Sequence, residues 1–400
     1  MSAAVLAVAT MDTKAEEIAF VASCLRAAGV EVRTVDVGTK ASPTIPADVP
    51  RETVLAGGKT PDDQDRGTAV TTMASALERY ITTEVGAGRV AGVIGIGGSG
   101  GTALITQAMR ALPVGLPKLM VSTVASGNTT PYVDCTDITM MYSVVDVAGL
   151  NVVSERILSN AAHAMAGMVA HEVEKSITPP CLGMTMFGVT TPCVTAVRKT
   201  LEDLGFDGLV FHATGTGGRA MEGLVRSGLI KGVLDLTTTE VADEIVGGIF
   251  PAGSKRFDAT IAAQIPFLLS VGAVDMVNFG GLDTVPDRFR DRNLHVHNAQ
   301  ITLMRTNKDE NRQIAKWIAA KLNSSTAPFT ILLPERGVSM LDAEGGPFYD
   351  PQTNAALFET LESEIKQSPG RKIQRLPLHI NDPEFADSAV TEFNYLLSQT

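Results

Sequence analysis

VIGIGGSGGTALITQAM, residues 93–109, combines an apolar run, five glycines within seven positions and a helix-like continuation. We interpret it as a buried strand, a loop from Gly97 to Gly101 and a helix that begins at Thr102. Glycine tolerates positive φ and leaves backbone N–H groups exposed, and the N-terminus of a helix favours anions. The stretch therefore predicts a strand–loop–helix unit of a parallel sheet, with a loop shaped to hold a phosphate.

The spacing of these glycines does not complete a known nucleotide fingerprint. The stretch satisfies G-x-G-x-x-G from Gly95 onward, but the next strand, KLMVSTVASG, lacks the terminal acidic residue of a dinucleotide site. It also approaches P-loop spacing, but Gly101 stands where the lysine is required. Tight packing of strand against helix explains the same glycines, so two interpretations stay open. The predicted nest of backbone N–H and hydroxyl groups comprises Gly97, Gly98, Ser99, Gly100, Gly101 and Thr102.

Short apolar runs alternate with helix-period segments along the chain, which is typical of βαβ units and a parallel sheet. One such unit opens at AVLAVATMDTK (4–14), with MDTK as a polar turn, and another opens at CLGMTM (181–186). Between them, HEVEKSITPPCLG contains two adjacent prolines that cannot continue a helix. We therefore predict a boundary near residues 176–181 and two doubly wound α/β domains with mainly parallel sheets, 1–178 and 179–400.

A second glycine-rich loop occurs in HATGTGGRAMEGLV (212–225), where a strand leads through glycines into a helix near Arg219. Ligands of open α/β sheets gather at the carboxyl ends of strands, so we expect the two loops to face one cleft between the domains. Other strand ends carry hydroxyl, amide, carboxylate or ammonium groups suited to a phosphate. The candidate nucleotide-binding residues outside the first loop are Asp12, Thr13, Lys14, Ser126, Asn128, Gly215, Thr216, Gly217, Gly218 and Arg256.

Some of these stretches have competing structural interpretations. TMDTK is also explained as a capped helix start, with Asp12 or Thr13 as the N-cap. TTTEVADEIVGG (237–248) offers carboxylates for magnesium, but it is also typical of a charged first helical turn. FPAGSKR (250–256) ends in two cations, and we expect a second anion contact there. The segment 40–67, with four prolines and many charges, is either a functional loop or a surface excursion.

Composition and charge argue against several classes of protein. The 400 residues include 44 Asp and Glu against 33 Lys and Arg, and the formal net charge of −11 opposes binding of nucleic acid. No stretch is long and apolar enough for a membrane span, and the N-terminus lacks the basic region of a signal peptide. The four cysteines lie far apart without CxxC spacing, and no residues have the spacing of a metal site. Together these features favour the cytoplasm.

Several long motifs resemble a known family in their order along nearly the whole chain, among them VATMDTKAEE, GIGGSGGTALIT, STVASGNTTPYV, DLTTTEVADEIVGG, FPAGSKRF, VNFGGLDTVP and LPERGVSMLD. It is the two-domain family of the ATP-binding region of the tomato mosaic virus resistance protein, with bacterial and fungal members of unassigned activity. The resemblance implies two Rossmann-like domains, a nucleotide bound with magnesium, and a homodimer or higher homo-oligomer. Because the plant protein continues into a barrel domain, the resemblance also implies a separate barrel-enzyme chain as a partner.

Two functional hypotheses follow from the residues and the resemblance together. We expect an ATP-binding module in which the Mg-nucleotide biases domain closure or partner binding, because no catalytic constellation is recognisable in the sequence. The alternative is an enzyme, either an ATP-dependent one acting on a small carboxylate or phospho-substrate or a subunit of a barrel enzyme. Neither hypothesis involves nucleic acid or a membrane as a partner.

Overall fold

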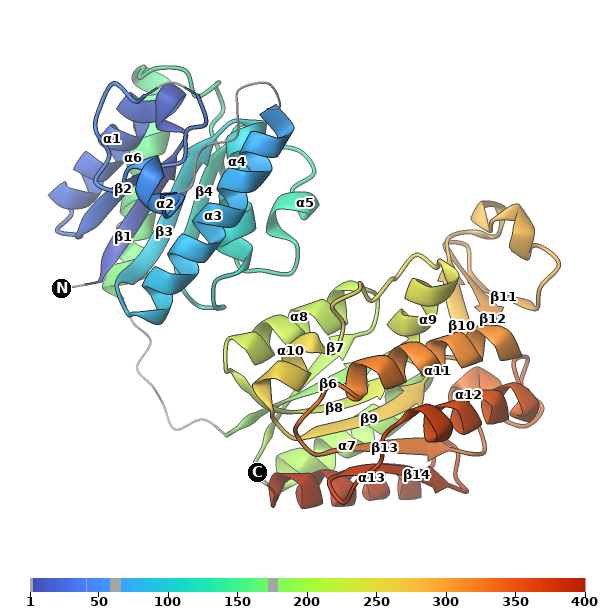
Figure 1. Cartoon of the computed structure of the whole chain (residues 1–400). Helices are drawn as coiled ribbons and strands as arrows, with labels where there is room; N and C mark the ends of the chain where they lie inside the picture. The colour runs from blue at the N-terminus through green and yellow to red at the C-terminus, as the bar shows by residue number, and fades with distance from the viewer. Residues whose placement is uncertain (1–2, 41, 58–65, 172–178, 400) are drawn as a thin grey trace. The chain divides into compact units, whose positions relative to one another are not determined.

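The computed structural model describes residues 3–40, 42–57, 66–171 and 179–399 of the chain. The chain divides into two compact units, Met1–Ser176 and Ile177–Thr400, each built on its own parallel sheet (Figure 1). The predicted α/β class with mainly parallel sheets is therefore confirmed. The predicted boundary falls partly on residues 172–178, which lie outside the described residues, and the cleft between the domains stays a prediction.

The first unit contains a five-stranded parallel sheet with the strand order β2-β1-β3-β4-β5. Its strands are β1 (Ala4–Ala9), β2 (Val32–Asp36), β3 (Val90–Gly97), β4 (Lys118–Ser122) and β5 (Thr139–Tyr142). Its described helices are α1 (Met11–Ala27), α2 (Arg51–Val54), α3 (Arg66–Gly86), α4 (Ser99–Arg110), α5 (Thr130–Val133) and α6 (Val152–Ala170). The chain runs from β1 to β2 on one side and returns to β3 on the other side of β1, so the winding direction reverses between β1 and β3.

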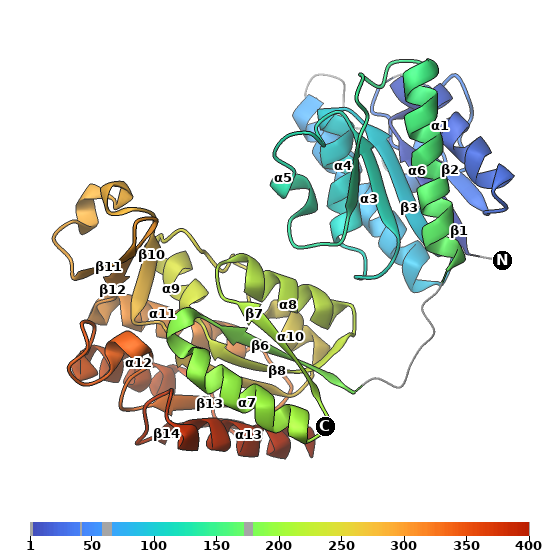
Figure 2. The same cartoon turned by 180° about the vertical axis from the view of Figure 1, so that it is seen from behind.

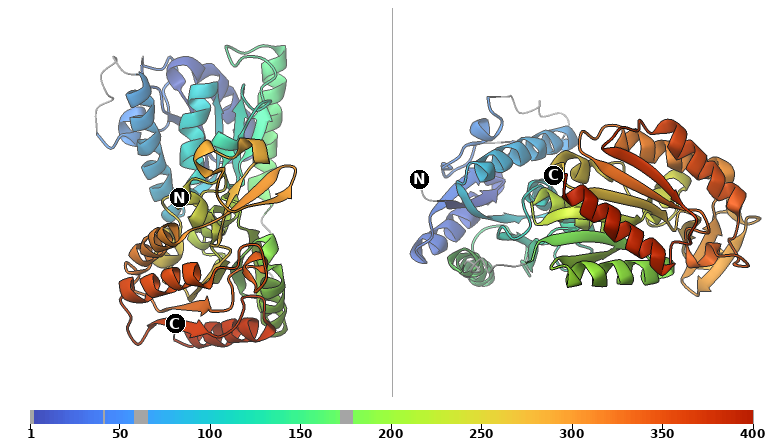
Figure 3. Two further views of the ribbon diagram at one scale, coloured as in Figure 1. Left: turned by 90° about the vertical axis from the view of Figure 1, so that its right-hand side faces the viewer. Right: turned by 90° about the horizontal axis from the view of Figure 1, so that it is seen from below.

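The side chains of β1 alternate between two apolar cores, as the two-residue period of a strand requires. Leu6 and Val8 pack with side chains of α3 and α4, whereas Val5 and Ala7 pack with those of α1 and α6. Figure 2 shows the face covered by α1 and α6, and Figure 3 shows α3 and α6 on opposite sides of the sheet. Because both faces are covered, the strands appear in the sequence as continuous apolar runs.

The second unit contains a six-stranded parallel sheet with the order β14-β13-β9-β8-β6-β7 and a three-stranded antiparallel sheet with the order β10-β12-β11. The parallel strands are β6 (Cys181–Met186), β7 (Asp207–His212), β8 (Ile230–Thr237), β9 (Phe267–Gly272), β13 (Phe329–Pro334) and β14 (Arg371–Leu376). The antiparallel strands are β10 (Met276–Phe279), β11 (Leu294–Asn298) and β12 (Ile301–Arg305). The helices are α7 (Thr191–Asp203), α8 (Thr216–Arg226), α9 (Thr239–Val246), α10 (Asp258–Ala263), α11 (Lys308–Leu322), α12 (Pro351–Glu364) and α13 (Pro383–Leu397).

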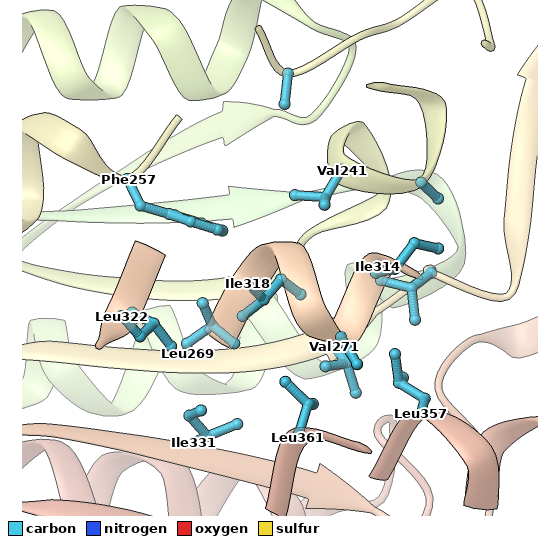
Figure 4. Close-up of a cluster of buried hydrophobic side chains, with 14 of the residues drawn as sticks. Val241, Phe257, Leu269, Val271, Ile314, Ile318, Leu322, Ile331, Leu357 and Leu361 are labelled. Carbon is cyan, nitrogen blue, oxygen red and sulfur yellow. The ribbon is translucent and has the colours of Figure 1, made fainter. Parts of the chain in front are cut away.

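The larger core of the second unit lies between the parallel sheet and helices that include α11 and α12 (Figure 4). Ile314, Ile318 and Leu322 lie four residues apart on α11, so they form one apolar stripe toward the sheet. Leu357 and Leu361 of α12 continue the same core. On the other face, α7 and α13 pack over a second core. In the part of the chain that the structure describes, no helix has both the length and the apolar character needed to cross a membrane.

Three helices begin earlier than the sequence predicts. The predicted turn MDTK is the first turn of α1, which begins at Met11. Helices α4 and α8 begin at Ser99 and Thr216, each about one turn before its predicted start. The prediction treats glycine as a loop residue, whereas glycine here lets a helix start directly beside its strand. A Cβ atom at Gly97, for example, would lie 3.1 Å from the backbone of Gly101.

Candidate functional site

The carboxyl ends of β1 and β3 lie side by side at the point where the winding of the first sheet reverses. Helix α1 leaves β1 toward one face of the sheet, and α4 leaves β3 toward the other face. Divergent connections of this kind leave a crevice at the end of the sheet, and ligands of open α/β folds bind in such crevices. The fold therefore places a candidate site in the first domain, at the glycine-rich stretch.

A pocket of about 300 Å³ opens at this reversal point. It is lined by residues from the start of α1, from the segment after β2 and from the first turn of α4. The seven predicted residues that the structure brings together here are Asp12, Thr13, Lys14, Gly98, Ser99, Gly100 and Gly101. Thr39 and Lys40 complete the polar wall, and the sequence-based prediction does not include Thr39. The sequence-based prediction mentions Lys40 only as the first residue of the 40–67 segment.

The first turn of α4 presents backbone donors to this pocket. Gly98 is the N-cap residue, and no side chain caps the helix. Within the described residues, no acceptor meets the N–H groups of Ser99, Gly100 and Gly101, and the first backbone bond runs from Thr102 N–H to the carbonyl of Gly98 at 2.8 Å. The partial positive charge of a helix N-terminus adds to these donors. An anion in the pocket would satisfy them.

The glycines of this stretch do not all serve the same purpose. A Cβ atom at Gly95 would lie 2.7 Å from side-chain atoms of Ile105 and Met120, so Gly95 is required by packing. At Gly98 and Gly101 a Cβ atom would find its nearest neighbours at 3.8 and 3.9 Å, and neither residue has positive φ. The packing explanation therefore holds for some of the glycines and leaves the pocket-lining Gly98 and Gly101 without an internal reason.

Lys14 brings a cation to the pocket from α1. The helix continues through Lys14 with a kink, at φ −132° and ψ 26°. The Lys14 ammonium group has no hydrogen-bond or ion-pair partner among the described residues. TMDTK is a helix start, as the competing interpretation predicts, but the prediction that Asp12 or Thr13 caps it is wrong. Asp36 does the capping instead, because its Oδ1 atom accepts a hydrogen bond from Met11 N–H at 3.1 Å.

Four other predicted residues lie away from the pocket lining. Thr102 is fully buried, and its hydroxyl group lies 2.6 Å from that of Ser122, so the hydroxyl is used within the fold. Ser126 and Asn128 are exposed after β4, and Asn128 Oδ1 accepts a hydrogen bond from Thr130 N–H at 3.1 Å, as in a turn. Gly97 precedes the pocket as a buried strand residue. Thr102, Asn128 and Gly97 thus have roles within the fold, and Ser126 stays a prediction outside the pocket lining.

In the second domain, a carboxylate of the chain itself fills the predicted phosphate nest. Glu240 Oε1 accepts hydrogen bonds from Gly215 N–H at 2.7 Å and from Gly218 N–H at 3.2 Å. Gly215 has a φ of 79°, and a Cβ atom at Gly217 would overlap the carbonyl of His212. The glycines of this loop are therefore explained by internal structure rather than by an external ligand, and Thr216 between them is the first residue of α8.

Arg256 lies in the interior beside this loop, with 2% of its surface exposed. Its guanidinium group forms ion pairs with Asp235, Glu240 and Glu222 at 2.7, 3.2 and 3.1 Å. Burial lowers the pKa of Arg256, but the three carboxylates more than reverse this effect, and the pKa is raised overall. Because a phosphate would have to displace a carboxylate, the predicted phosphate contact of Arg256 does not fit the structure.

The described residues offer few ligands for a magnesium ion. Among the described residues, no three His, Cys, Asp or Glu side chains group closely enough to hold a metal ion. Asp12 is the carboxylate of the pocket, and its Oδ2 atom already accepts a hydrogen bond from Lys40 N–H at 3.0 Å. This donor set fits a magnesium ion that arrives with phosphate oxygens and water, since such ions use one or two carboxylates.

Comparisons with known proteins cover both domains. Residues 3–174 and 179–397 match the N-terminal and C-terminal domains of the uncharacterised protein family UPF0261. A UPF0261 protein of Rhizobium meliloti (strain 1021) is 53% identical over 391 residues, which cover 96% of this chain and 97% of that protein. The ToMV resistance protein Tm-1(GCR237) of Solanum lycopersicum is 46% identical over 415 residues, which cover 97% of this chain and 55% of that protein.

A solved structure of the glycosyltransferase SnogD from Streptomyces nogalater aligns with 99% of this chain and 100% of that chain at 10% identity, but its TM-score of 0.21 is too low to support any inference. The two matched domains and the close relatives agree with the resemblance read from the sequence motifs. The chain belongs to the uncharacterised protein family UPF0261, which includes relatives of the tomato Tm-1 proteins.

Proposed function

We propose that the first domain binds a phosphate-bearing ligand, with ATP and Mg²⁺ as the first candidate, in the pocket between the ends of β1 and β3. In this proposal the phosphate oxygens accept hydrogen bonds from the N–H groups of Ser99, Gly100 and Gly101. Lys14 neutralises part of the phosphate charge, and Asp12 contributes to the magnesium shell. The reversal point of the sheet and the 300 Å³ pocket support this location.

The observation that carries the proposal is that Gly98 and Gly101 are glycines although the fold does not require glycine at either position. Gly101 lies in the first turn of α4, where glycine costs about 1 kcal/mol relative to alanine. Gly98 has the extended conformation of an N-cap residue, at φ −77° and ψ −168°, and aspartate or serine would cap the helix there. Both residues line the pocket. Their small size leaves the helix N-terminus open to a ligand at some expense of stability.

Thermal unfolding with ATP, ADP, AMP and inorganic triphosphate, each with and without magnesium, tests the proposal. A ligand at 100 times its dissociation constant stabilises the native state by about 2.7 kcal/mol, which raises the unfolding temperature by several degrees. We expect the wild type to show this shift with magnesium and ATP, and Lys14→Gln to show a smaller one. Lys199→Gln removes an exposed cation on α7 of the other domain and serves as the matched control.

Gly98→Asp gives the sharper test, because it should keep the fold while blocking the ligand. The new carboxylate caps α4 itself, so we expect the unliganded variant to be at least as stable as the wild type. The same carboxylate competes with phosphate for the N–H groups, so the ATP-dependent shift should vanish. Equal ATP shifts in the wild type and Gly98→Asp would place the ligand elsewhere. No shift with any phosphate compound would refute the proposal.

A further inference from the structure

Lys40, in the segment after β2, is held beside the pocket through both its backbone N–H group and its backbone carbonyl. Asp12 Oδ2, on α1, accepts a hydrogen bond from Lys40 N–H at 3.0 Å. Arg51, on α2, donates a hydrogen bond from Nη1 to the Lys40 carbonyl at 3.3 Å. The side chain of Lys40 is exposed and belongs to the pocket lining. Two charged side chains thus fix the backbone of one surface lysine beside the proposed ligand.

The anchor of this arrangement is buried. Arg51 Nε donates a hydrogen bond to Asp36 Oδ2 at 2.9 Å, and both side chains are shielded from solvent. Asp36 Oδ1 also accepts a hydrogen bond from Gly38 N–H at 2.7 Å. A Cβ atom at Gly38 would lie 2.9 Å from Asp12 Cγ and 3.2 Å from Arg51 Nη2. The backbone at Gly38 therefore passes between the side chains of Asp12, Asp36 and Arg51, where a residue with a Cβ atom does not fit.

Each of three neighbouring strands is followed by a source of positive charge. Lys14 follows β1, the open N-terminus of α4 follows β3, and Lys40 follows β2, which lies on the other side of β1. Neighbouring strands are about 4.8 Å apart, so the ends of β2 and β3 are separated by roughly 10 Å. The strand ends from which Lys40 and α4 emerge are therefore farther apart than one phosphate group spans, whereas a chain of two or three phosphates approaches this distance.

We infer that Lys40 is a second phosphate-binding cation, which selects ligands with a di- or triphosphate chain over monophosphates, and that Asp12 is its positioning residue. This inference rests on the proposed function of the pocket. It assigns Asp12 a role that does not require metal: the carboxylate oxygen holds the Lys40 peptide, so that the lysine side chain reaches the outer end of the phosphate chain. The α4 N-terminus and Lys14 hold the inner phosphate.

Titration calorimetry with ATP and AMP, each with and without magnesium, separates these roles. For Lys40→Gln we expect about a tenfold or larger loss of ATP affinity and no change for AMP, because a charge-assisted hydrogen bond is lost at the outer phosphate only. Asp12→Ala should show the same pattern. Asp12→Asn keeps an oxygen acceptor for the Lys40 N–H group and should restore ATP binding measured without magnesium. Lys199→Gln is the control for the loss of a charge.

The outcomes distinguish the inference from the function on which it rests. If Lys14→Gln weakens ATP and AMP while Lys40→Gln changes neither, or changes both equally, Lys40 does not select the phosphate chain and the inference fails alone. If, without magnesium, Asp12→Asn loses ATP affinity to the same extent as Asp12→Ala, the positioning role of Asp12 is wrong. If no variant changes the binding of any phosphate compound, the proposed function fails. Lys40→Gln alters an exposed side chain, so it tests the inference even if Asp12→Ala does not fold.

Discussion

Glu240 Oε1 lies 2.7 Å from the backbone nitrogen of Gly215, at the place in the second domain where the sequence predicts a bound phosphate. The same oxygen accepts a hydrogen bond from Gly218 N–H, and Glu240 Oε2 pairs with Arg256. The two glycine-rich loops therefore differ in what their N–H groups meet. In the second domain the Glu240 carboxylate occupies the loop, whereas in the first domain the loop lines an open pocket. Stability and ligand binding can be tested on them separately.

Glu240→Ala should destabilise the second domain by about 3–5 kcal/mol, because it removes one of the three carboxylates around the buried Arg256 and leaves the N–H groups of Gly215 and Gly218 without an acceptor. Acetate added at high concentration should restore part of the loss by entering the vacated site. Trp317 is the single tryptophan and lies on α11 of this domain, so its fluorescence follows the unfolding. Glu202→Ala, at an exposed ion pair on α7, should change stability by less than about 1 kcal/mol and show no acetate effect. Equal responses of the two variants to acetate would contradict this account.

Gly218→Ala should also destabilise the second domain, by roughly 3 kcal/mol, because a Cβ atom there would overlap Glu240 Oε2 and Arg256 Nε. The matched control is Gly223→Ala on the same helix, where the nearest atom to a Cβ is Arg226 Nη2 at 3.8 Å. That control should be neutral or stabilising by up to about 1 kcal/mol, since alanine favours the helix. Urea unfolding followed by Trp317 fluorescence measures both. A tolerated Gly218→Ala would mean that Glu240 does not occupy the loop.

The fold is predictable from the sequence because both sheets are buried on both faces. Strands such as Ala4–Ala9 are continuous apolar runs, and Gly29 and Gly205, both with positive φ, follow the helices where the pattern predicts their ends. Helix starts are less predictable, since the pattern does not show whether a glycine serves a turn or close packing. Ser99 and Thr216 begin helices for this reason, although the stretches read as loops.

The candidate site is only partly predictable, because its contacts join segments far apart in the chain. The pocket collects the predicted Asp12–Lys14 and Gly98–Gly101 stretches, whose place at strand ends is visible in the sequence. Asp36 and Arg51 escape prediction, since nothing in their local pattern shows that they meet. Arg256 is misjudged because its three carboxylate partners come from other elements. The homo-oligomer and the barrel-enzyme partner stay predictions.

Gly97→Ala and Gly98→Ala should differ in their effect on the first domain. A Cβ atom at Gly97 would press on the backbone of Gly101 and Thr102 at 3.1 Å, and moving a helix start costs about 1–2 kcal/mol. At Gly98 the nearest atom is Thr123 Oγ1 at 3.8 Å, so alanine should change the stability by less than about 0.5 kcal/mol. Calorimetric unfolding of both variants without ligand measures the difference. A similar loss in both would restore the packing explanation for Gly98.

Asp243 makes the stability of the second domain depend on pH. Burial raises the pKa of Asp243 to about 7, against hydrogen bonds from Asn278 and Phe250 that lower it, and nearby Glu240 raises it further. In the unfolded chain an aspartate has a pKa of about 3.9, so between these values the folded state binds the proton more tightly. Burial raises the pKa of Glu222 as well, which acts in the same direction.

We therefore expect the free energy of unfolding of the second domain to fall as the pH rises from 5 to 7, by up to about 1.4 kcal/mol per pH unit from Asp243, and to level off above pH 7. The stabilising contribution is complete below the unfolded pKa and is lost as the pH passes the folded pKa. Urea midpoints from Trp317 fluorescence at pH 5, 6, 7 and 8 give the slope. Asp243→Asn imitates the protonated form and should reduce that slope, whereas the exposed control Glu202→Ala should keep it. Identical slopes for the wild type and Asp243→Asn between pH 5 and 7 would show that Asp243 is ionised throughout, held by the N–H groups of Phe250 and Asn278.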